Sequence, residues 1–130
     1  MAPKRTEKRP TDAELAILRV IWERGPSTVR EVFDHLSATQ DSGYTTVLKL
    51  MQIMTEKELL VRDSSTRPQV FSASRSQEQT QRQLLRDLLD RAFSGSPGDL
   101  VLQALASRRS TVEERKEIRD LLDRLEGSES

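Results

Sequence analysis

The sequence predicts a mainly α-helical protein in which three helices and a two-stranded hairpin come first and a second helical region follows. Three observations support this fold class. Apolar residues recur at helical spacing along most of the chain. Threonine and glutamate stand three residues apart before two of these stretches, which is the spacing of a capping box. Two short β-prone stretches, near Leu60 and near Val70, flank a polar tip between the two helical regions.

The first helix is predicted to begin at Thr11 or Asp12 as its N-cap and to end at Gly25 and Pro26. Its apolar residues share one stripe, which makes Trp22 a core anchor: Leu15, Leu18, Ile21 and Trp22. A second helix follows Thr28, whose spacing to Glu31 is that of a capping box. Its buried side is predicted to consist of Val29, Val32, Phe33 and Leu36. A polar turn, "SATQDSG", leads to the third helix.

The third helix, in the stretch "SGYTTVLKLMQIMTEKELL", has two different faces. At about 100 degrees per residue, its inner face is predicted to hold Val47, Leu50, Met51 and Met54. The opposite face is predicted to hold Thr45, Leu48, Lys49 and Gln52, with Tyr44 and Thr46 near its first turn. Threonine, lysine and glutamine offer donors and acceptors to base edges and phosphates in a major groove. A simple solvated face is the alternative interpretation of the same pattern.

A hairpin is predicted after this helix, with strands near Leu60–Val61 and Gln69–Phe71. Three helices closed by such a hairpin form the winged helix-turn-helix plan. The hairpin carries Arg62 and Arg67 where a wing would meet a DNA backbone. Together with the third helix, this predicts a DNA-binding set: Tyr44, Thr45, Thr46, Lys49, Gln52, Arg62 and Arg67.

The remaining chain predicts three helices, over residues 79–93, 99–106 and 110–125, the last capped by Thr111 and Glu114. Their leucine stripes need another surface to cover them, either a second copy of the chain or the first lobe of the same chain. The first option predicts a homodimer through Leu85, Leu88, Leu89, Leu100, Val101, Leu105, Ile118, Leu121, Leu122 and Leu125. The predicted organisation is a disordered basic arm at 1–10, a winged-helix DNA-binding domain at 11–74, a helical dimerisation domain at 75–126 and a disordered tail at 127–130.

The composition narrows the class of protein further. Lysine and arginine total 21 against 21 aspartate and glutamate, so net charge alone does not indicate a polyanionic partner. The basic arm can touch phosphates or act as a solubilising tail. The absence of cysteine excludes a disulfide framework and a thiolate metal site, and fits a reducing cytosol. No apolar run approaches the roughly 20 residues of a spanning helix, so we expect a cytoplasmic protein without membrane insertion.

The motifs resemble one known family. The stretches "PTDAELAILRVIWERGPSTVREVFDHL", "GYTTVLKLMQIMTEKELL", "RPQVFSA" and "FSGSPGDLVLQAL" are similar, in order, to the penicillinase repressor (BlaI/MecI) family of bacterial transcriptional regulators, from about Pro10 to Leu125. The resemblance implies a winged-helix domain that binds palindromic operators as a homodimer held by a helical C-terminal domain. It places Thr46 and Lys49 in the recognition helix and Arg62 and Arg67 in the wing.

The resemblance also implies a partner, a membrane-bound sensor metallopeptidase whose signal leads to cleavage of the repressor. The best-known relatives are cut at an Asn-Phe bond, where this chain has Gln103 and Ala104, so the cleavage site does not carry over. The cysteine cluster of copper-responsive relatives is absent from this chain.

No catalytic constellation is present in the sequence. His35 is the sole histidine, and there is no glycine-rich phosphate loop, nucleophile elbow or HExxH motif. We therefore predict no enzyme, no cofactor and no metal site. The favoured function is a dimeric transcriptional repressor that binds operator DNA. The alternative is a winged-helix adaptor that binds proteins without sequence-specific DNA binding.

Overall fold

The structure, a computed structural model, describes residues 9–39 and 41–129. The first eight residues of the predicted basic arm lie outside this range. The chain divides into two compact units between Leu84 and Leu85. The sequence places the domain boundary earlier, after residue 74. Thr80, in the first turns of the intervening helix, is buried, so this part of the helix belongs with the first unit.

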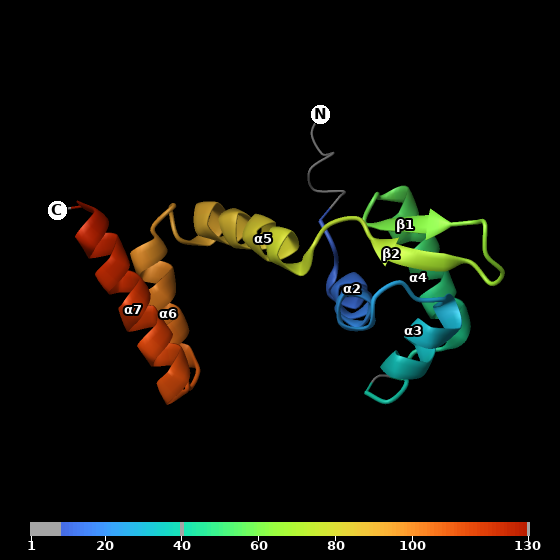
Figure 1. The fold of residues 1–130 in the computed structure, drawn as a ribbon, viewed down its shortest axis with the longest axis horizontal. Helices are drawn as coiled ribbons and strands as arrows, with labels where there is room; N and C mark the ends of the chain where they lie inside the picture. Colours follow the sequence, from blue (N-terminus) through green and yellow to red (C-terminus); the bar gives the residue numbers. More distant parts are fainter. Residues whose placement is uncertain (1–8, 40, 130) are drawn as a thin grey trace. The chain divides into compact units, whose positions relative to one another are not determined.

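The first unit contains three helices and a hairpin, as predicted (Figure 1). Its elements are α2 (Asp12–Arg24), α3 (Val29–Leu36), α4 (Tyr44–Glu56), β1 (Leu60–Asp63) and β2 (Val70–Ala73). The hairpin lies against α2 and α4, and each of the three helices contacts the other two. This arrangement is a winged helix-turn-helix, with α3, the following turn and α4 as the helix-turn-helix and the hairpin as the wing.

Local capping fixes where α2 and α3 begin. Thr11 is the N-cap of α2: its Oγ1 accepts the Glu14 amide at 3.2 Å, while its own amide donates to Glu14 Oε1 at 2.9 Å. Thr28 and Glu31 make the same two bonds at the start of α3, at 3.1 and 2.9 Å. Gly25 ends α2 with φ of 91°, a backbone conformation in which a side chain would be strained. Both predicted helix starts are therefore confirmed.

The core of the first unit is built from one apolar face of every element. Helix α4 contributes Val47, Met51 and Met54, and the wing contributes Leu60 and Phe71. The other buried apolar side chains come from α2 and α3: Ala16, Ile17, Leu18, Val20, Ile21, Val29, Val32 and Leu36. Trp22 is partly buried against this core, and its indole Nε1 donates to the Arg75 carbonyl oxygen at 3.0 Å. The predicted anchor thus ties α2 to the segment that leaves the wing.

The wing is an antiparallel pair that runs in register from Leu60 opposite Ala73 to Asp63 opposite Val70. The link between α2 and α3 pairs with β2 through one isolated antiparallel bridge, between Ser27 and Phe71. Ser27, fully buried, donates its amide to the Phe71 carbonyl oxygen at 3.0 Å and accepts the Phe71 amide at 2.8 Å. The wing is therefore anchored to the helix-turn-helix by backbone hydrogen bonds as well as by apolar packing.

The helical region contains α5 (Gln77–Ala92), α6 (Pro97–Ser107) and α7 (Val112–Glu129). Helix α6 starts two residues earlier than predicted because Ser96 caps it, accepting the Asp99 amide at 3.1 Å. Thr111 and Glu114 form the predicted box before α7, with bonds of 2.8 and 2.9 Å. Residues 127–129, predicted as disordered, continue α7, and Ser128 Oγ donates to the Arg124 carbonyl oxygen one turn earlier. Ser130 lies outside the described range.

Candidate nucleic-acid interface

Helix α4 is fixed in the first unit by one apolar face. Val47, Met51 and Met54 are at most 1% exposed and pack against the helices and the wing. Leu50 and Leu48 are partly buried against the same core. Leu48 is the exception to the predicted pattern, because it was expected on the outward face to meet a thymine methyl. It lies on the flank of the helix, where its side chain is partly covered.

The opposite face of α4 consists of exposed polar side chains. Thr45, Lys49 and Gln52 lie on this face at spacings of four and three residues, with Tyr44 and Thr46 exposed in the first turn. Because α4 is held from behind by buried methionine and valine, these groups are presented on a rigid support. Hydroxyl, ammonium and amide groups in this arrangement can donate to and accept from base edges and phosphate oxygens.

The C-terminal end of α4 is tied to the start of α2 by a buried ion pair. Lys57, the C-cap residue, places Nζ 2.8 Å from Glu14 Oε1. The Glu14 side chain is 3% exposed and that of Lys57 is 21% exposed. The same carboxylate oxygen accepts the Thr11 amide in the capping box. One carboxylate thus organises the first turn of α2 and holds the far end of α4, and no sequence pattern links residues 14 and 57.

The N-terminal end of α4 meets α3 in a cluster of one cation and two aromatic rings. The Tyr44 ring packs edge-on against Phe33, with centroids 5.7 Å apart and an interplanar angle of 76°. The Arg30 guanidinium lies 4.9 Å from the Tyr44 centroid and 5.7 Å from the Phe33 centroid. The sequence does not predict the contact of Arg30 with Tyr44, because Arg30 lies on α3 and the pattern of one helix does not identify its neighbours on another.

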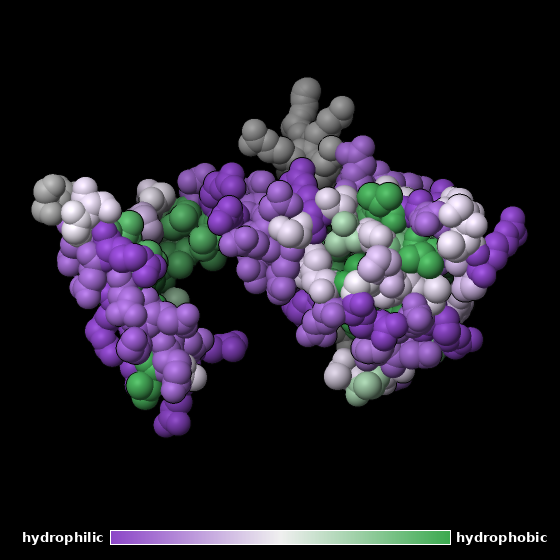
Figure 2. All heavy atoms as spheres, in the orientation of Figure 1, coloured by the Kyte–Doolittle hydropathy of each residue, from purple (hydrophilic) through white to green (hydrophobic). Residues whose placement is uncertain are grey.

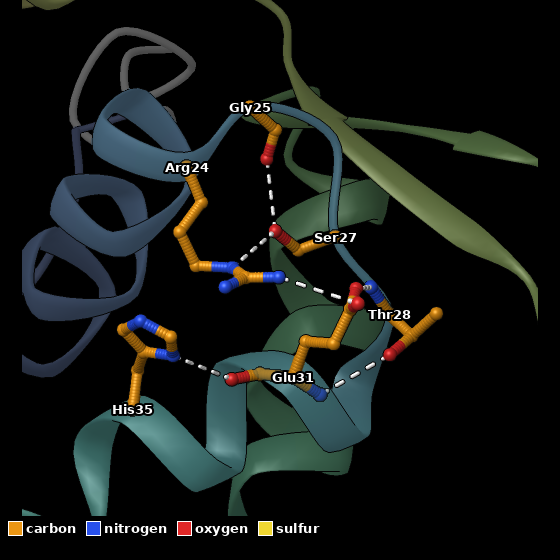
Figure 3. Close-up of polar contacts among 6 residues, drawn as sticks. All are labelled: Arg24, Gly25, Ser27, Thr28, Glu31 and His35. Atoms are coloured by element: carbon orange, nitrogen blue, oxygen red, sulfur yellow. Dashed lines mark hydrogen bonds and ion pairs between the residues drawn. The ribbon is translucent and has the colours of Figure 1, made fainter.

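The junction between α2 and α3 is held by a polar network (Figure 3). Ser27 Oγ donates to the Gly25 carbonyl oxygen at 2.8 Å, and Arg24 Nη2 pairs with Glu31 Oε2 at 3.2 Å. The hydrogen bond from the Thr28 amide lowers the pKa of Glu31, and the positive charge of Arg24 lowers it further. His35, one turn on, places Nδ1 3.3 Å from the Glu31 carbonyl oxygen. Within residues 9–39 and 41–129, no group of three metal-ligating side chains is arranged to hold an ion.

The wing presents the two predicted arginines. Arg62 lies on β1 opposite Phe71, and Arg67 lies in the loop between the strands; both are exposed. The loop is ordered by Asp63, whose Oδ1 accepts the Ser65 hydroxyl at 2.6 Å and the Ser65 amide at 3.0 Å. These hydrogen bonds lower the pKa of Asp63. Among the described residues, no hydrogen bond or ion pair joins either wing arginine to the predicted reading residues of α4.

The predicted dimerisation residues are all left uncovered or partly covered by the described chain. Seven of them are exposed, and Leu89, Leu100 and Ile118 are partly buried. Two further exposed apolar side chains, Leu102 at 70% and Val112 at 65%, were not predicted because they stand outside the main stripes. Figure 2 shows green apolar atoms on this helical region among the purple polar ones. In the described part of the chain, no helix has the length and apolar character needed to cross a membrane.

These elements define the class of the protein as a winged helix-turn-helix protein. The second helix of its helix-turn-helix, α4, has an exposed polar face. A sequence model of the penicillinase repressor family matches residues 10–124, and the chain belongs to that family. The resemblance predicted from the motifs is thereby confirmed, and the family is one of repressors rather than enzymes.

Two relatives from Mycobacterium tuberculosis, strains CDC 1551 / Oshkosh and ATCC 25618 / H37Rv, are both named Transcriptional regulator BlaI. Each is 32% identical to this chain over 82 residues. The similarity covers 62% of this chain and 59% of each relative, so the chain spans less than two thirds of their length.

Proposed function

We propose that this chain is a cytoplasmic transcriptional repressor that binds a palindromic DNA operator as a homodimer. The observation that carries the proposal is the division of α4 into two faces. Its Met51 and Met54 side chains are fully buried, while Thr45, Lys49 and Gln52 on the other side are exposed. A helix-turn-helix places such a face in the major groove, where the side chains of its first turns reach base edges.

The wing supplies the second part of the proposed interface. Arg62 and Arg67 are exposed and carry the positive charge that a phosphate backbone attracts. Because the chain as a whole is formally neutral, attraction to DNA depends on where the charges lie. Asp63, the acidic residue at the end of β1, accepts two hydrogen bonds from Ser65. We expect these bonds to hold its carboxylate against the wing loop.

The dimer is proposed from the unburied leucines of the helical region. Neither α6 nor residues 112–128 of α7 contain a buried residue, although α7 alone presents Leu121, Leu122 and Leu125 at 46–51% exposure. Apolar stripes of this extent are expected to be covered by another surface, and a second copy offers a self-complementary one. Two DNA-binding units joined in this way bind two half-sites, and the second binding event then profits from a high effective concentration.

Relief of repression by a membrane-bound sensor metallopeptidase is included in the proposal on the basis of the family resemblance. Because Gln103 and Ala104 replace the Asn-Phe bond, the position of a cut is left open; a cut anywhere between the first unit and α7 would separate the DNA-binding unit from α7. Each DNA-binding unit would then bind a half-site by itself, and the gain from effective concentration would be lost.

The test is a fluorescence anisotropy titration of the full chain against the DNA upstream of its own gene, with a shuffled duplex of equal length as control. We expect tighter binding to the upstream DNA and a steep loss of affinity as the salt concentration rises. Equal or absent binding to both duplexes would overturn the repressor and favour the protein-binding adaptor.

A further inference from the structure

We propose that Arg30 is a DNA phosphate contact, held in place by a cation–π contact with Tyr44, and that it marks the edge of the interface contributed by α3. This inference rests on the proposed DNA-binding function. It extends that function to a residue outside both α4 and the wing. Three observations carry it: the position of the Arg30 guanidinium, its contact with the Tyr44 ring, and the lack of an ion pair for Arg30 among the described residues.

The guanidinium of Arg30 is held between two elements. It lies 4.9 Å from the centroid of the Tyr44 ring, and Tyr44 is the first residue of α4. Phe33, one turn along α3 from Arg30, packs edge-on against the same tyrosine at 5.7 Å. Phe33 thereby limits the movement of the ring, and the ring limits the movement of the guanidinium. Arg30 is thus placed at the N-terminal end of α4, the proposed reading helix.

The charge of Arg30 is not neutralised by a neighbouring carboxylate. Among residues 9–39 and 41–129, Arg30 forms no ion pair, although Asp34 stands four residues further along the same helix. Two other cations of this unit do pair, Arg24 with Glu31 and Lys57 with Glu14. Arg30 is exposed, so its charge is available to an anion from outside.

A guanidinium that lies over an aromatic ring keeps N–H groups available for other hydrogen bonds. An arginine uses its flat face on an aromatic ring, while its N–H groups point outward from the edge. That edge matches the paired oxygens of a phosphate. When a recognition helix enters the major groove, phosphates line both walls of the groove. A cation on the preceding helix beside the start of α4 is therefore suited to a backbone phosphate rather than to a base.

The experiment measures DNA affinity at several salt concentrations for the wild-type chain and for Arg30→Gln, with the upstream duplex and the shuffled duplex as probes. We expect Arg30→Gln to weaken binding to both duplexes by a similar factor, roughly tenfold for each half-site. We also expect the slope of log affinity against log salt to become shallower by about 0.9 for each phosphate contact removed. The preference for the upstream duplex should stay the same, because phosphates carry no sequence information.

A matched control removes the same charge elsewhere. Arg19 is exposed on the α2 face that also carries Asp12 and Glu23, which is an unsuitable face for DNA. Arg19→Gln should leave affinity and salt slope unchanged. Arg30→Lys should keep the wild-type slope but bind more weakly than wild type, because an ammonium cannot stack and fork as a guanidinium does. Tyr44→Leu should weaken binding in the wild-type background more than in the Arg30→Gln background, since part of its effect acts through Arg30.

The outcomes separate this inference from the function on which it rests. If the wild-type chain binds neither duplex, the proposed function fails. If the wild-type chain binds and Arg30→Gln keeps the wild-type salt slope, Arg30 is not a phosphate contact. A loss of affinity that follows a loss of folding, with an unchanged slope for the folded fraction, would assign Arg30 a purely structural role and would also overturn the inference.

Discussion

Replacing Lys57 by methionine tests how α4, the proposed recognition helix, is held at its C-terminal end. Methionine retains most of the aliphatic stem but removes the ammonium that pairs with Glu14 at 2.8 Å. The carboxylate of Glu14, 3% exposed, then keeps the Thr11 amide but loses the ammonium group that faces it. Removal of one partner from a buried ion pair typically costs about 3–5 kcal/mol. Because the Lys57 side chain is 21% exposed and water can partly replace it, we expect a loss near the lower end, about 3 kcal/mol.

The free energy of unfolding is measured by urea denaturation of the full chain, followed by tryptophan fluorescence. Trp22 is the only tryptophan of the chain and lies against the core of the first unit, so the signal reports on that unit. A small domain loses about 1 kcal/mol of stability per molar urea, so the midpoint should fall by roughly 3 M. A loss below about 1 kcal/mol would refute the reasoning, because it would mean that the carboxylate is adequately solvated without Lys57.

The double variant Glu14→Gln with Lys57→Met is the matched control. Glutamine can fill the same position of a capping box and still accept the Thr11 amide, but it carries no charge. We therefore expect the double variant to recover most of the stability that Lys57→Met loses. If the double variant is as unstable as Lys57→Met alone, the loss comes from packing around residue 57 and not from an uncompensated charge.

Three further outcomes are expected. Lys49→Ala and Arg67→Ala should each weaken operator binding while leaving the dimer intact, because both side chains are exposed in the DNA-binding unit; unchanged affinity in both would misplace the interface. Leu121→Asp combined with Leu122→Asp should yield monomers with lower operator affinity, since charges would enter an apolar stripe; light scattering that shows an undisturbed dimer would contradict this. Glu31 has a lowered pKa, so its contribution to stability is present above the ordinary value of 4.5 and is lost as the pH falls below it. Glu31→Gln, which keeps the capping box, should flatten the dependence of stability on pH in that range, and an unchanged pH profile would show that another group causes it.

The fold was largely predictable because its rules are local. The box of Thr28 and Glu31 and the box of Thr111 and Glu114 each act over three residues, and they set helix starts whatever the rest of the chain does. The periodic burial of Val47, Met51 and Met54 follows in the same way from the helical repeat. Leu48 departs from the expectation because a side chain on the flank of a helix can be covered by a neighbouring element, which periodicity alone does not locate.

The parts that could not be predicted are contacts between distant residues. The sequence does not identify Glu14 as the buried partner of Lys57, because 43 positions separate the two. The bridge between Ser27 and Phe71 joins a linker to a strand, and neither stretch has a pattern that names its partner. The contact between Arg30 and Tyr44 could not be predicted either, because it depends on how α3 packs against α4. The sequence therefore predicted the exposed polar residues of α4, but neither the position of Leu48 nor the contacts that hold this helix in place.

The most direct test of the central claim, that the outward face of α4 lies against DNA bases, is site-directed disulfide cross-linking. The chain has no cysteine, so a single introduced thiol reports on one position only. Thr45→Cys places a thiol on the exposed face of α4, and Arg19→Cys places one on the outer face of α2. With an upstream duplex that carries a thiol tethered to a base in the major groove, we expect cross-linking of Thr45→Cys and none of Arg19→Cys. Equal yields for the two variants, or cross-linking of Arg19→Cys alone, would contradict the account.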